Sequence, residues 1–135
     1  LYAEISALDN DNTSRRISLS DSTSNNHISI DISEYTDTII GRVRSSNIEY
    51  AFMVVSGINQ TNTNKIALKY KSNDCSLWIN GSKLATDTSV TMPIGLSELS
   101  IDKGQNSNPF YGNIKETKLY NTALTDSELQ ALTSN

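Results

Sequence analysis

His27, Ser29 and Asp31 alternate along "HISIDIS", and these are the three residue types of a hydrolase triad. Strand residues two apart are separated by roughly 6.5–7 Å, so His27 and Asp31 should stand about 13 Å apart at Cα. A triad needs hydrogen-bond contact at about 3 Å. We therefore interpret these side chains as an exposed polar face of a strand.

A glycosidase would need two carboxyl groups roughly 5–10 Å apart across a cleft. Glycosidases of the β-sandwich fold typically place Glu, Asp and Glu at alternate positions of one strand, and no E-x-D-x-E spacing occurs here. Glu98 and Asp102 share a strand face but lie further apart, on a short segment. The sequence therefore predicts a protein that is not an enzyme, and a glycan-degrading activity is the least favoured alternative.

Asp9 and Asp11 in "DNDN" offer clustered oxygen ligands of the kind that calcium prefers. The segment lacks the spacing of a recognised calcium loop, and Asx-rich turns also connect strands without metal. Calcium at Asp9 and Asp11 is therefore a minor hypothesis, and no other cofactor is expected. Cys75, the single cysteine, alternates with Leu77 and Ile79, which predicts a buried thiol in the core.

Trp78 in "CSLWING" is out of phase with Leu77 and Ile79, so it should point away from the core. An exposed tryptophan on a flat sheet can stack on a sugar ring, or it can pack under a neighbouring segment. We carry both alternatives. The predicted ligand-binding set is an aromatic platform with polar neighbours: Trp78, Lys69, Asn73, Asp74, Asn80 and Tyr111.

The chain has 135 residues, of which 36% are hydrophobic and 19% charged, and a net charge of −4. This size suits one domain with one core. Phosphate recognition needs dense Lys and Arg, so nucleic acid is not expected as a partner. No apolar run approaches the ~20 residues of a membrane span, so membrane insertion is not expected either.

Alternating apolar and polar residues recur along the chain, most cleanly at Ile28, Ile30 and Ile32. Polar turns such as "NQTNTN" and "KGQNSN" separate these runs. About ten short strands around one core predict an all-β, antiparallel β-sandwich over residues 1–135, taken as a single domain. Because the chain starts at Leu1 inside an apparent strand, we expect it to be a fragment of a longer protein.

The C-terminal segment carries a different pattern. Thr125 and Glu128 fit a capping box, which predicts the start of a short helix. Leu124, Leu129 and Leu132 can then face the core. Such a short helix is marginal alone, so it should form only by docking on the sandwich.

Three stretches in this order resemble the concanavalin A-like, laminin-G-like jelly rolls: "RRISLSDSTSNNHISI", "KIALKYKSNDCSLWING" and "FYGNIKETKLYNTALTDSEL". They look most like the modules of bacteriophage tail-fibre and virion structural proteins. The resemblance implies a lectin-like jelly roll on a virion, outside the cell. Its partners would be a cell-surface glycan or host receptor and other virion subunits.

The resemblance and the residues together favour a non-enzymatic binding module for a carbohydrate or host surface. The alternative is an architectural domain that makes only protein–protein contacts. The exposure of Trp78 should separate the two, because a glycan platform must be open and a packing residue must be covered.

Overall fold

The computed structural model describes residues 1–103 and 107–135. Its elements are β1 (Tyr2–Ala7), β2 (Arg15–Ser20), β3 (His27–Ile32), β4 (Thr38–Ser45), β5 (Ile48–Ser56), β6 (Asn64–Lys69), β7 (Cys75–Ile79), β8 (Ser82–Asp87), β9 (Glu98–Ser100), β10 (Gly112–Lys118) and α1 (Asp126–Thr133). The turn predicted at "KGQNSN" lies partly outside the described residues. No helix in the described part of the chain is long and apolar enough to cross a membrane.

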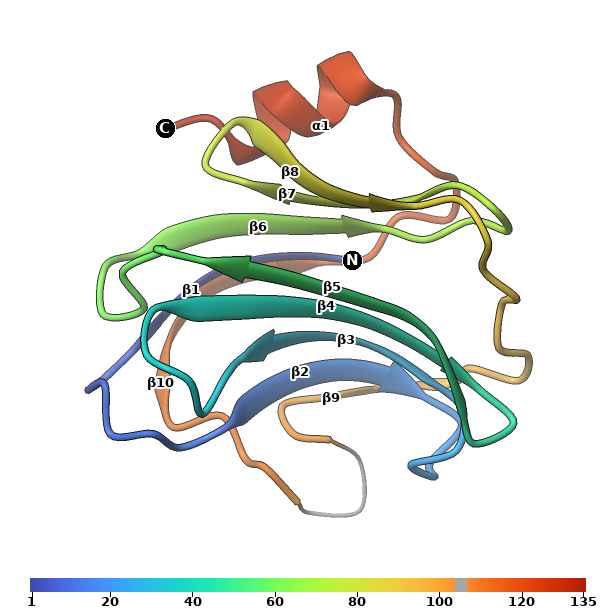
Figure 1. The fold of residues 1–135 in the computed structure, drawn as a ribbon, viewed down its shortest axis with the longest axis horizontal. Helices are drawn as coiled ribbons and strands as arrows, with labels where there is room; N and C mark the ends of the chain where they lie inside the picture. Colours follow the sequence, from blue (N-terminus) through green and yellow to red (C-terminus); the bar gives the residue numbers. More distant parts are fainter. Residues whose placement is uncertain (104–106) are drawn as a thin grey trace.

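The strands form two antiparallel five-stranded sheets (Figure 1). The first sheet has the order β10-β1-β6-β7-β8, and the second has the order β5-β4-β3-β2-β9. The helix lies on one side of the sandwich, against β6, β7 and β8 (Figure 1). The predicted fold class, a jelly-roll-like β-sandwich with one short C-terminal helix, is confirmed.

The core lies between the sheets and follows from the period-2 alternation of each strand. The inward side chains are almost all aliphatic, and the second sheet contributes Ile17, Ile28, Ile30, Ile32, Ile39 and Val43 to the cluster. Cys75 is 2% exposed within this core, as the sequence predicts. Burial raises the pKa of its thiol, which makes it a poor nucleophile.

Helix α1 begins with the predicted capping box. Thr125 Oγ1 accepts a hydrogen bond from the Glu128 backbone nitrogen at 3.3 Å, and Glu128 Oε2 accepts one from the Thr125 nitrogen at 2.8 Å. These bonds satisfy two backbone donors that the first helical turn leaves open. The end of the helix is tied to the β7–β8 turn, because the Gly81 nitrogen donates to Thr133 Oγ1 at 3.1 Å.

The sequence suggested that the helix leucines face the core between the sheets, and the structure shows that they do not. They pack on the outer face of the first sheet, where Leu129 joins Tyr2, Ala67 and Trp78 in a second, smaller cluster. The reason is topological: the chain leaves β10 at the sheet edge, so its last segment can only cross the outside. The helix therefore covers the part of this outer face that β6, β7 and β8 form.

Leu129→Ala should lower the free energy of unfolding by roughly 2–4 kcal/mol, because Leu129 is 4% exposed and its removal leaves a cavity under α1. Leu84→Ala is the matched control, since Leu84 is 44% exposed on β8. Urea denaturation of both variants measures the difference. Equal losses in the two variants would mean that α1 is not docked.

Candidate functional site

Trp78 does point away from Leu77 and Ile79, but it is 5% exposed. It lies in the cluster beneath α1 with Leu129, and its Nε1 donates to Ser76 Oγ at 3.0 Å. Of the two alternatives for Trp78, packing under a neighbouring segment is confirmed, and an exposed platform at Trp78 is excluded. This burial counts toward the architectural alternative and against a glycan site at Trp78. The alternation along a strand determines which face of the sheet a side chain points to. Whether that side chain is buried there depends on α1, which lies far along the chain.

The polar residues predicted around Trp78 have structural partners. Lys69 Nζ pairs with Asp74 at 2.8 Å, and Asn73 Oδ1 accepts from the Val90 nitrogen at 3.1 Å. Asn80 Nδ2 donates to the side chain of Asn64 at 2.9 Å. These contacts hold the turns that flank β7. A ligand-binding role for these residues stays a prediction.

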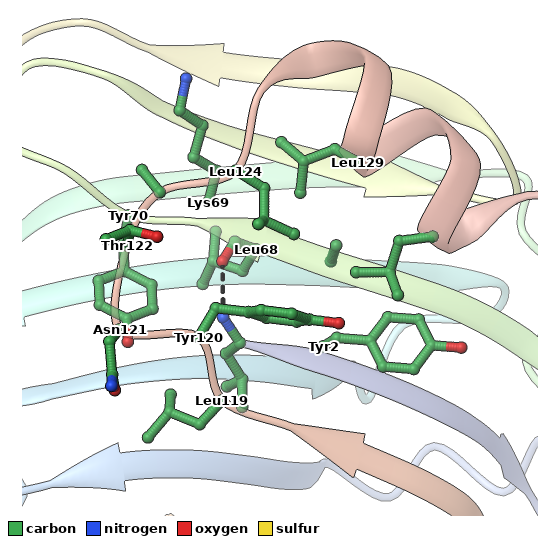
Figure 2. Close-up of a pocket in the computed structure, with 14 residues that line it drawn as sticks. Tyr2, Leu68, Lys69, Tyr70, Leu119, Tyr120, Asn121, Thr122, Leu124 and Leu129 are labelled. Atoms are coloured by element: carbon green, nitrogen blue, oxygen red, sulfur yellow. Dashed lines mark hydrogen bonds between the residues drawn. The ribbon is translucent and has the colours of Figure 1, made fainter.

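A cavity of about 180 Å³ opens beside this cluster (Figure 2). Leu124 and Leu129 point into it from the C-terminal segment, and the ring of Tyr120 lies beside that of Tyr2 (Figure 2). Lys69, which also lines it, is already paired with Asp74. Polar groups of Asn121 and Thr122 line it together with the leucines, so the cavity does not discriminate between an apolar group and a hydroxyl-bearing one.

Tyr111 is 62% exposed just before Gly112, which pairs with Ala7 at the end of β1. Ala7 lies five residues along β1 from Tyr2, roughly 17 Å from the Trp78 cluster, so the structure does not bring Tyr111 and Trp78 together. Tyr111 as a ligand contact stays a prediction.

Asp9 and Asp11 lie in the loop that precedes β2. Asp11 Oδ1 pairs with Arg15 Nη2 at 2.8 Å, and this hydrogen bond holds the pKa of Asp11 below its usual value. Asp9 Oδ1 accepts from the neighbouring Asn10 nitrogen at 2.7 Å. Within residues 1–103 and 107–135, no group of three or more His, Cys, Asp or Glu side chains is placed to hold a metal ion. Calcium here stays a prediction.

The outer face of the second sheet is the most unusual surface of the protein. Strand pairing brings together outward side chains from β2, β3, β4 and β5. We call this surface the arginine face, and its members are Arg16, Ser18, His27, Ser29, Asp31, Arg42, Arg44, Glu49 and Phe52. A face predicted to be exposed is in fact dense: His27, Ser29 and Asp31 are 1%, 0% and 1% exposed.

The Asp31 carboxylate is the centre of the arginine face. Its Oδ2 accepts from Arg16 Nη2 at 2.6 Å and from Arg42 Nε at 2.5 Å. Arg42 Nη1 also reaches Glu49 Oε2 at 3.2 Å. The Arg42 guanidinium lies 4.3 Å from the centroid of the Phe52 ring, a cation–π contact on the rim of the network.

Five buried side-chain nitrogen and oxygen atoms have no hydrogen-bond partner among the described residues, and all five belong to the arginine face: Arg16 Nε, His27 Nε2, Ser29 Oγ, Asp31 Oδ1 and Arg44 Nε. Buried polar atoms are almost always satisfied, because an unmade hydrogen bond costs about 1–3 kcal/mol. Donors and acceptors both occur in this set. These atoms lie beneath the surface, so a ligand on this face would contact the more exposed side chains around them, Arg42, Arg44, Glu49 and Phe52.

His27 is uncharged in this setting. Burial, followed by the nearby charge of Arg16, lowers the pKa of His27 to about 4. Its Nδ1 lies 3.2 Å from the Ser24 carbonyl oxygen, so Nδ1 carries the proton and Nε2 is an acceptor.

The arginine face was missed from the sequence because strand pairing assembles it from segments that are distant along the chain. One signal was present: "GRVRS" places Arg42 and Arg44 in the same alternating phase that "HISIDIS" gives to His27 and Asp31. Charged residues at alternate positions of two neighbouring strands indicate that ion pairs form on the outer face of the sheet.

A sequence profile described as the concanavalin A-like lectin/glucanases superfamily matches residues 5–130. The chain belongs to this superfamily. A comparison with curated proteins finds no match.

One solved structure with a similar fold is the carbohydrate-binding module CBM40 of the Ruminococcus gnavus IT-sialidase. It superposes with a TM-score of 0.78 at 20% identity, over 98% of this chain and 80% of that one. The same module bound to α2,3 sialyllactose gives 0.77 at 20% identity, with the same coverage. A leech intramolecular trans-sialidase gives 0.77 at 22% identity over 98% of this chain and 22% of that one. These likenesses show a shared fold.

His27→Gln should flatten the pH dependence of stability. The unfolded histidine takes a proton near 6.5 and the folded one near 4, so folding becomes less favourable as pH falls through this window. The loss attributable to His27 reaches up to about 3 kcal/mol near pH 4. Urea denaturation at pH 7 and pH 4.5 measures it, and carboxylates titrate alike in both proteins. An identical slope for wild type and His27→Gln would contradict the burial of a neutral histidine.

Proposed function

We propose that this domain is a non-enzymatic carbohydrate-binding module that holds its glycan on the arginine face. The observation that carries the proposal is the exposed ring of Phe52, 49% open to solvent, beside the accessible polar side chains of Arg44 and Glu49. A sugar ring has an apolar side that stacks on an aromatic ring and hydroxyl groups that both donate and accept hydrogen bonds. The sialyllactose held by the similarly folded CBM40 supports a glycan as ligand.

The proposed biological setting is a virion. The resemblance to tail-fibre and virion modules supports a role in recognising a host cell surface, as one module of a longer virion protein. The ligand would then be a cell-surface glycan. Contacts with other virion subunits would use the surfaces away from the arginine face.

A glycan screen with a multivalent display of the domain tests the proposal. Single sites of this kind bind with millimolar to high-micromolar affinity, roughly 4–6 kcal/mol, so display in many copies is needed for detection. Phe52→Ala should weaken binding of any hit about fivefold, through loss of about 1 kcal/mol of ring contact. Tyr35→Ala is the matched control, because Tyr35 is 67% exposed in the β3–β4 loop.

Tyr111→Ala tests the site predicted from the sequence in the same assay. Loss of binding in Tyr111→Ala with normal binding in Phe52→Ala would move the glycan away from the arginine face. Absence of binding to every glycan displayed would remove the carbohydrate-binding function itself.

An architectural role is the second candidate, and the edge strand β5 favours it. Ile48, Phe52 and Val54 are 54%, 49% and 46% exposed there, and an edge strand offers unpaired backbone groups to another chain. Light scattering across a hundredfold concentration range tests it. Concentration-dependent association that Val54→Lys abolishes would support this role, and a monomer throughout would oppose self-association through β5.

A further inference from the structure

We infer that the ligand of the arginine face carries one acidic group, a carboxylate or a sulfate, and that Arg44 is its anchor. This inference rests on the proposed function, because it names the class of glycan that the same surface would hold. On this face, carboxylates neutralise two of the three arginine side chains and leave the third without a carboxylate partner among the described residues.

Two of the three guanidiniums on the face are matched by carboxylates. Arg16 and Arg42 share Asp31, and Arg42 also contacts Glu49. Arg44 has no such partner in the part of the chain that the structure describes. Its Nη2 donates to the backbone and side-chain oxygens of Asn47 at 3.3 and 2.7 Å, and both acceptors are neutral.

Arg44 Nε is buried and has no hydrogen-bond partner among those residues. The residue as a whole is half-buried, so part of its side chain meets solvent. A planar guanidinium matches an anion that has two oxygens side by side. A partly desolvated guanidinium whose contacts are all neutral is therefore the best candidate on this surface to bind an anionic group.

The neighbours of Arg44 limit the ligand to one charge. His27 stands opposite Arg44 on β3 and adds no positive charge near neutral pH. Glu49 stands opposite on β5, and Arg42 engages its Oε2. Glu98 lies at the β9 edge, three strands away and roughly 14 Å distant, beyond the reach of unscreened charge at physiological salt. Three cations against Asp31 and Glu49 leave one positive charge.

Phe52 lies close enough to Arg44 for a single sugar to contact both. Phe52 pairs with Arg42, which is two residues from Arg44 on the same side of β4. Alternate residues of a strand are roughly 7 Å apart, about the span of one pyranose ring with its substituent. One sugar could therefore cover the exposed side of Phe52 while its acidic group faces Arg44.

The test compares 3′-sialyllactose, a sulfated lactose and lactose itself by NMR titration of the wild-type domain. The two acidic sugars should bind at least about tenfold more tightly than lactose, because hydrogen bonds to a charged group are the stronger kind. The advantage should shrink on raising the salt from low to high concentration. Which acidic sugar binds more tightly distinguishes a carboxylate from a sulfate ligand.

Arg44→Gln should abolish this advantage, so that the variant binds the acidic sugars no more tightly than it binds lactose. Lys115→Gln is the control of equal charge change, since Lys115 pairs with Glu4 on the first sheet. Should Arg44→Gln not fold, the side-chain Nε–H signal of Arg44 in the wild type gives the readout, and it should shift with acidic sugars only. Equal affinity for all three sugars, or a preference that survives Arg44→Gln, overturns the inference alone. Binding of none overturns the proposed function as well.

Discussion

A strand in a two-layer sandwich can bury only one of its faces in the shared core, and the rest of this structure follows from that constraint. The inner faces of both sheets are filled with aliphatic side chains, most of them less than 3% exposed. Each sheet is left with an outer face that contains large side chains. The two outer faces are completed in different ways, one by a helix and the other by a network of charges.

On the first sheet, Tyr2, Ala67 and Trp78 would be an apolar patch if α1 did not cover them. The helix is short, so it depends on this docking as much as the patch depends on the helix. Polar contacts fix its position, among them the pair between Lys83 and Asp126 at 2.5 Å. The outer face of the first sheet therefore contributes to the stability of the fold.

On the second sheet, no helix covers the outward residues, and arginine side chains lie over the strands instead. A buried carboxylate shared by two guanidiniums is a poor way to gain stability, because desolvation offsets much of the attraction. The unpartnered atoms around it add to the cost.

Local patterns in the sequence predict most of the fold. Alternation at Ile28, Ile30 and Ile32 and the capping box at Thr125 each depend on residues a few positions apart, and both are confirmed. The cover over Trp78 and the meeting of Arg16 with Asp31 depend on strand register and helix docking, which no short window contains. The fold was therefore predictable, whereas the candidate site required the three-dimensional arrangement.

The most direct test is a map of backbone amide shifts in the domain as an acidic oligosaccharide is added. A glycan on the arginine face should shift the amides of β3, β4 and β5 around Asp31, Arg42 and Phe52, and should leave α1 and β7 unperturbed. Shifts confined to the cavity beneath Leu129, or to the loops around Tyr111, would contradict the placement of the binding site on the second sheet.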